Sequence, residues 1–245
     1  DLYEMYLTPK GFTKPKPLTA LNDDDYWDSQ PALSPDGKVI FFVSNRPGGP
    51  GGLDIWYSYQ NYLSQWSPPK PVPNINTPGN EYSPHFGADG YFYFSTNWNY
   101  DENEKGDRGK DIYRADFENE NGILLPTNPI ELDEAIAMDA EKYGISVPEG
   151  LELNSDKDDE FPYITKDRRF IFITSNRDED YDKRNLFAYA LPKSRIRLQV
   201  NVYETILDAD GSVIKEQTMK KDLALTIIDK ESDAVKEINS GKPYE

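Results

Sequence analysis

The chain has 245 residues, a net charge of −17 at pH 7 and no cysteine. This length accommodates one large all-β domain or a domain plus part of another, and an aromatic content of 13% supplies bulky core side chains. The 44 acidic residues outnumber the 27 basic ones, which argues against nucleic acid or an anionic membrane surface as the main partner. Without cysteine there is no disulfide and no thiolate, and no run of apolar residues is long enough to predict a transmembrane segment.

The chain begins on a segment that returns three more times. Each copy has an aromatic residue two positions after Asp or Asn, and the four copies are residues 1–6, 54–59, 111–116 and, more loosely, 185–190. A Pro-bearing stretch follows the first two copies, at 11–18 and 66–73. Proline is tolerated at a sheet edge because no ladder donor is needed there, so we expect outer edge strands at these two places. We also expect the sequence to start inside a repeat.

Residues 28–59 are the template of this repeat. A first strand ends near Leu33, Asp36-Gly37 turns the chain, 39–44 form a second strand and 53–59 a third. Two short apolar runs joined by Asp-Gly are a strong signal for a β-hairpin. Such a three-stranded unit still has a face to bury, so repetition of the unit is expected to determine the fold.

Three prolines in the first strands set the repeat length. Pro84 follows Pro31 by 53 residues, and Pro162 follows Pro84 by 78, so the second interval holds an insertion of 25 residues. We place this insertion within 121–158. The spacing of Leu132, Ile136 and Tyr143, after early acidic residues, predicts a short helix there.

Periods of this length with about four short strands each are typical of β-propeller blades. We therefore expect an all-β fold, with residues 1–191 forming a partial β-propeller of about three full four-stranded blades plus a split blade. A β-sandwich is the alternative, although its strands do not normally repeat the same turn residues at fixed offsets. The expected blade cores are residues 28–59, 81–118 and 159–191. After Pro192 the pattern changes, and we expect an incomplete β-sandwich-like domain over 195–245.

Two stretches carry a resemblance to known repeats. Asn-Thr-Pro-Gly-Asn-Glu-Tyr-Ser-Pro at 76–84, leading into Tyr-Phe-Ser-Thr-Asn at 93–97, resembles the WD-like propeller repeats of bacterial envelope proteins of the OmpA family. Pro-x-x-Ser-Pro-Asp-Gly-Lys at 31–38 is similar to the repeat of the TolB propeller. The resemblance implies a location in the periplasm or at the outer-membrane surface, and a following β-sandwich like the regulatory domain of carboxypeptidases. The motif is specific for fold and weak for activity.

Residues that do not recur between the repeats are the candidates for binding. Such residues lie in or beside the loops at 48–52 and 99–110, and in the insertion. The binding residues that we predict are Arg46, Trp98, Tyr100 and Arg108. Asn45 and Asn176 follow equivalent strands, and we expect each to satisfy backbone groups of its loop. Exposed tryptophans could stack on sugars, but strand tryptophans are more often packing residues.

Few groups could carry catalysis or bind a metal. His85 is the only histidine and no Gly-x-Ser-x-Gly motif is present, so we expect a structural role for it and no catalytic residue. Asp178, Asp180 and Asp182 alternate as in a Ca²⁺ loop, but Lys183 stands where glycine is needed and Tyr189 where a Glu is needed. We therefore expect a solvated acidic loop and no cofactor, with Ca²⁺ as the alternative.

Taken together, these features favour a non-enzymatic cell-envelope propeller that acts as a protein–protein interaction scaffold. The partner would be an envelope protein. The alternative is a propeller that binds carbohydrate or cleaves a glycoside through paired carboxylates, with a glycan as its ligand. A third hypothesis is scaffolding that depends on a cation.

Overall fold

The computed structural model describes residues 1–100, 109–177 and 184–191 with their side chains, and the backbone of five further strands. These strands are β12 (Glu104–Lys105), β18 (Tyr203–Leu207), β19 (Val213–Met219), β20 (Ala224–Ile228) and β21 (Val235–Asn239). The chain divides into two compact units, Asp1–Ser194 and Arg195–Glu245. Within the second unit β18 pairs with β19 and β20 with β21, both antiparallel. No helix of the described residues is both long and apolar enough to cross a membrane.

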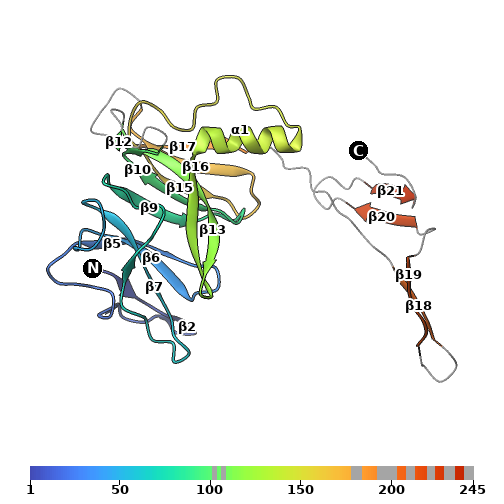
Figure 1. Cartoon of the computed structure of the whole chain (residues 1–245), viewed down its shortest axis with the longest axis horizontal. Coiled ribbons are helices and arrows are strands. Elements are labelled where there is room, and N and C mark those ends of the chain that lie inside the picture. Colours follow the sequence, from blue (N-terminus) through green and yellow to red (C-terminus); the bar gives the residue numbers. More distant parts are fainter. Residues whose placement is uncertain are drawn as a thin grey trace. The chain divides into compact units, whose positions relative to one another are not determined.

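The first unit contains three antiparallel sheets of three or four strands in chain order, together with two-stranded pairs (Figure 1). The first sheet consists of β5 (Asp28–Leu33), β6 (Val39–Ser44), β7 (Asp54–Tyr59) and β8 (Lys70–Pro71). The second sheet consists of β9 (Glu81–Phe86), β10 (Phe92–Thr96), β13 (Asp111–Glu120) and β14 (Ile123–Glu131). The third sheet consists of β15 (Asp159–Ile164), β16 (Phe170–Ser175) and β17 (Asn185–Ala190). The all-β class is confirmed.

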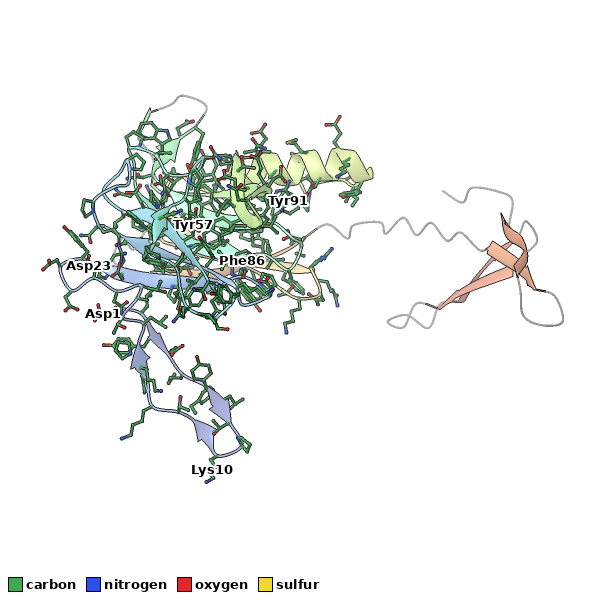
Figure 2. The ribbon with its side chains drawn as sticks, turned by 60° about the horizontal axis from the view of Figure 1, so that its bottom comes forward. Asp1, Lys10, Asp23, Tyr57, Phe86 and Tyr91 are labelled. Carbon is green, nitrogen blue, oxygen red and sulfur yellow. The ribbon has the colours of Figure 1, made fainter. Side chains whose placement is uncertain are left out.

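Short strand pairs form in two further places, the N-terminal segment and the loop that follows β10. β1 (Tyr3–Glu4) pairs with β4 (Lys16–Pro17), and β2 (Leu7–Thr8) with β3 (Gly11–Phe12). Figure 2 shows this N-terminal arm extending away from the three sheets, with Lys10 at its tip. β11 (Trp98–Asn99) pairs with β12. The two Pro-bearing edge strands expected from the sequence are therefore present as β4 and β8.

A bulge in each first strand explains how proline fits there. Gln30, Ser83 and Phe161 have φ values of 51°, 53° and 54°, and each immediately precedes a proline. The pairing of each first strand with the second strand shifts register at this position. Proline is accepted at bulges because the ladder is interrupted there. A left-handed conformation at a non-glycine residue costs free energy, and its recurrence in all three sheets identifies it as architecture.

The three sheets pack face to face. Alternate residues of the first sheet, Phe41 and Ile55 among them, form one core cluster with Phe92 and Phe94 of the second sheet. The other face of the second sheet packs against the third through Tyr93, Ile112, Ile171 and Ile173. Opposite faces of one strand thus belong to different clusters, as the two-residue period of β-structure requires. A third cluster joins Leu2 and Leu21 to the remaining face of the first sheet.

The helix predicted within the insertion is α1 (Leu132–Tyr143). It begins after Glu131, whose carboxylate accepts a hydrogen bond from the Glu134 N–H, and ends at Gly144 in the left-handed conformation. Leu132 and Ile136 are buried in the cluster between the second and third sheets. The segment 121–158 was predicted as an insertion with a helix, but its first part is a strand. This strand, β14, is the fourth strand of the second sheet.

Candidate functional site

Arg46 is held inside the first sheet. Its guanidinium lies 2.6 Å from Asp28 Oδ1 and donates to the carbonyl oxygen of Leu21, also at 2.6 Å. Its Nε donates to Ser44 Oγ at 3.0 Å. The Asp28 carboxylate is fully buried, so the ion pair compensates a charge that water does not reach. This geometry places Arg46 in the structure of the repeat, in contrast to the ligand contact that the sequence suggested for it.

The third sheet contains the same arrangement. Arg177 lies 2.6 Å from Asp159 Oδ1, donates to the Leu153 carbonyl oxygen at 2.6 Å and bonds Ser175 Oγ at 3.0 Å. The sequence signal was available, because Asn-Arg follows the second strand in both sheets. What the sequence did not show is that Asp159, the first residue of β15, is the partner.

The second sheet replaces this ion pair with uncharged donors. Glu81 takes the place of the buried Asp and accepts hydrogen bonds from the hydroxyls of Thr77 and Thr96. Trp98 stands where the other sheets have Arg. The hydroxyl of Tyr100 donates to the carbonyl oxygen of Ile75, the group equivalent to those that the arginines bind. Tyr100, predicted as a binding residue, is therefore also used within the fold.

Glu81 is a buried carboxyl group that no cation contacts among the described residues. Burial raises the pKa of Glu81 from 4.5 to about 8, although three hydrogen bonds from Thr77 and Thr96 oppose this effect. The nearby Asp54 adds to the rise, and burial raises the pKa of Asp54 as well. The glycine loop wraps closely around Asp54, because a Cβ on Gly49 would lie 2.0 Å from Asp54 Oδ2. Glycine is therefore required there for packing.

The asparagine that follows each second strand binds a backbone group. The side-chain oxygens of Asn45, Asn97 and Asn176 accept hydrogen bonds from backbone N–H groups just before the first strand of the same sheet, at 2.7, 2.8 and 2.8 Å. Asn45 and Asn176 thus satisfy backbone groups as predicted, but the groups are the N–H of Trp27 and of Asp158 rather than groups of the loop that follows each asparagine. Trp98 is half-buried, with its Cβ close to Gly79.

A second set of asparagines links each sheet to the one before it. Asn22, Asn76 and Asn154 each form two hydrogen bonds with one residue in, or just before, an earlier strand, accepting from its N–H and donating to its carbonyl oxygen. The residues bound are Leu2, Ile55 and Ile112. The residue before each asparagine, Leu21, Ile75 or Leu153, is completely buried. Each junction thus combines an apolar anchor with an amide that pairs with a backbone N–H and C=O.

Leu186 occupies the position in the third sheet that corresponds to Leu2, Ile55 and Ile112. In contrast to them, it is not buried by other described residues. It follows Asn185, which pairs with Ser175 in the register in which Asp54 pairs with Ser44 and Asp111 with Thr96. Ile55 and Ile112 are 0% exposed, whereas Leu186 is 70% exposed. Among the described residues, no asparagine side chain forms hydrogen bonds with the backbone of Leu186.

The sheet face beyond Leu186 is largely apolar, although Leu186 itself pairs with Thr174, which in turn pairs with Glu160. Directly paired residues share a face, so Phe170, Phe172 and Tyr163 lie on the same side as Leu186, together with Ala188 and Ala190. We call these six residues the open face. Tyr163 and Phe170 are 49% and 37% exposed. This face is the candidate functional site, because the equivalent faces of the first and second sheets are covered by the next sheet.

The remaining predicted residues carry no site in the described structure. Arg108, Asp178, Asp180 and Asp182 lie outside the described residues, so neither their contacts nor the Ca²⁺ alternative can be placed. The described part of the chain has no group of three or more residues arranged to hold a metal ion. His85 lies with its ring 5.3 Å from that of Tyr163, and burial lowers its pKa.

Comparisons with known proteins identify no family. No family model matches the chain, and no curated protein matches it. Among solved structures, the crystal structure of a puromycin hydrolase matches with a TM-score of 0.32 and 10% identity, over 79% of this chain and 34% of that one. A serine mutant of puromycin hydrolase in complex with PGG matches with a TM-score of 0.30 and 11% identity, over the same shares. The chain thus spans about a third of these structures.

Proposed function

We propose that this chain is a non-enzymatic scaffold, built from β-propeller repeats, that binds a protein partner in the bacterial cell envelope through the open face. The exposure of Leu186, at 70% against 0% for Ile55 and Ile112, carries the proposal. The envelope location rests on the resemblance of residues 31–38 and 76–97 to repeats of envelope proteins. The propeller interpretation rests on the serial packing of three sheets with a common register.

The repeated junctions indicate what the partner should present. Each junction between sheets pairs the backbone N–H and C=O of a buried third-strand residue, Ile55 or Ile112, with an asparagine that follows a buried Leu or Ile. We infer that the partner approaches the open face with a β-sheet unit of this kind, in which a Leu-Asn or Ile-Asn pair precedes the first strand. Its apolar side chain would cover Leu186, and its amide would bond the Leu186 backbone. Burial of an exposed Leu contributes about 1.5–3 kcal/mol to such an interface.

Capture from an envelope extract tests this proposal. The chain is immobilised as the wild type and as Leu186→Asp, which places a charge on the most exposed large side chain of the open face. We expect the aspartate to abolish capture of a specific envelope protein, because a buried charge without a partner is costly. Residues 121–158 should not be deleted for this purpose, since β14 and α1 contribute to the core.

Leu124→Asp is the matched control. Leu124 is 53% exposed on β14, outside the open face, so it undergoes the same chemical change on another surface. Retained capture by Leu124→Asp together with loss in Leu186→Asp supports the proposal. Equal capture by all three proteins contradicts it, provided that their melting temperatures agree.

A further inference from the structure

A groove lies between α1 and the β13–β14 hairpin and uses none of the residues of the open face. Its volume is about 350 Å³, and its lining includes Tyr91, Arg114, Met138 and Lys142. Figure 2 shows Tyr91 next to α1. The helix belongs to the inserted segment, so neither the first nor the third sheet has a counterpart of this groove. Features that interrupt a repeat are where function beyond architecture is expected.

Arg114 forms a fixed wall of the groove. It is an ion-pair partner of Asp139 on α1, at 2.5 Å, and its guanidinium lies 4.1 Å from the centre of the Tyr91 ring. A further bond at 3.4 Å joins it to the carbonyl oxygen of Ala135. These contacts tie α1 to β13 and use most of the charge of Arg114 internally. The wall is therefore rigid and close to neutral.

A bulge directs Asn128 to the groove. Arg114 pairs with Ile130 and Asp116 with Thr127, so β14 has two residues, Asn128 and Pro129, opposite the single residue Ala115. Asn128 is one of them and has a φ of 50°. Bulges re-aim side chains next to binding sites, and left-handed non-glycine residues concentrate at such sites. Like Gln30, Ser83 and Phe161, Asn128 immediately precedes a proline, so its left-handed conformation is of the same kind as in the first strands. What differs is its place, on β14 in the lining of the groove beside α1.

Two hydrogen-bonding groups of the groove are unused. The amide of Asn128 and the carboxylate of Asp116 have no hydrogen-bond partner among the described residues, and both residues are exposed. An amide offers donors and an acceptor side by side, and a carboxylate offers acceptors only. Ile130 and Met138 add apolar surface between them. This combination suits a ligand with several hydroxyl groups and apolar ring faces.

The charge and the volume of the groove limit the class of ligand further. The groove has two acidic residues, Asp116 and Asp139, and two basic ones, Arg114 and Lys142, so it favours neither a strong anion nor a cation. The volume lies at the lower end of the range for small-molecule sites. We propose that the groove binds a neutral polyhydroxylated ligand of one or two sugar rings.

Sugar titrations of the whole chain test this site. The probes are methyl glucoside, methyl galactoside, methyl mannoside and N-acetylglucosamine, with binding followed by ligand-observed NMR. Asn128→Gly removes the amide while glycine accepts the left-handed backbone, so the fold is kept. Loss of one hydrogen bond predicts an affinity roughly two- to tenfold lower than that of the wild type. Asp116→Asn, which keeps the shape and removes the charge, should also weaken binding.

Asn121→Gly is the matched control. Asn121 is also an exposed asparagine with a φ of 54°, but it lies in the turn of the β13–β14 hairpin, outside the groove lining. Sugar binding that is unchanged in this variant and weakened in Asn128→Gly supports the site. The proposal is overturned if no probe binds at about 10 mM, a concentration that detects even very weak sites. It is also overturned if Asn128→Gly binds like the wild type, or if inorganic phosphate displaces the sugar.

Discussion

Replacement of Glu81 by Gln should stabilise the protein at neutral pH. Glu81 is fully buried and has hydroxyl and N–H donors, and no cation contacts it among the residues described with side chains. Its pKa rises from 4.5 to about 8 in the folded state, so the folded protein binds this proton more tightly than the unfolded chain. The stabilisation from Glu81 is therefore complete below pH 4.5 and is lost as the pH rises toward 8.

The magnitude follows from the pKa difference. The free energy of unfolding changes by about 1.4 kcal/mol per pH unit while only the folded state carries the proton. Between 4.5 and pH 7 the interval is 2.5 units, which corresponds to a loss of about 3 kcal/mol. Gln cannot ionise, and its amide can replace the protonated carboxyl group in the bonds with Thr77 and Thr96. We expect a gain of about 1–3 kcal/mol at pH 7 and no gain near pH 4.

Urea unfolding of wild type and Glu81→Gln at several pH values between 4 and 9 measures this difference. Groups that do not interact with Glu81 titrate equally in both proteins and cancel, so the difference between the curves reports the titration of Glu81 together with that of the neighbouring Asp54. Glu118→Gln is the matched control, because Glu118 is exposed on β13 and should change stability by less than about 0.5 kcal/mol at every pH. A Glu81→Gln effect that does not vary with pH, or that destabilises throughout, would refute the reasoning.

The other predictions concern the junctions. Arg46→Met should destabilise by about 3–5 kcal/mol because it leaves Asp28 buried and unpaired, and adding Asp28→Asn should recover most of this loss in a double-mutant cycle. Leu186→Ala should change the free energy of unfolding by less than about 0.5 kcal/mol, whereas Ile112→Ala should cost about 2–5 kcal/mol, and equal losses would contradict the exposure difference. Asn76→Ala removes two backbone contacts and should lower stability by about 1–3 kcal/mol in urea unfolding.

The local structure was predictable because its causes lie within a few residues. The Asp-Gly turns at Gly37 and Gly90, the helix at Leu132–Tyr143 and the backbone-binding asparagines follow from turn chemistry, spacing and internal comparison. The repeat also predicted that several strand pairs share one register. A turn or a capping contact needs only neighbours in the sequence, and the sequence determines those neighbours completely.

The candidate sites depended on contacts between distant residues. The sequence suggested that Arg46 is a free loop residue, whereas in the fold it contacts Asp28 and the Leu21 carbonyl oxygen. Tyr100 binds the Ile75 carbonyl oxygen in the place of an arginine, and only this tertiary contact shows its role. The sequence by itself indicated the three recurring strands of each sheet and their alternation, whereas β14 and the β2–β3 and β11–β12 pairs were not predicted. Only the tertiary structure decided which face of each sheet is covered, and hence that Leu186 is exposed, because burial depends on what packs against a strand rather than on the strand itself.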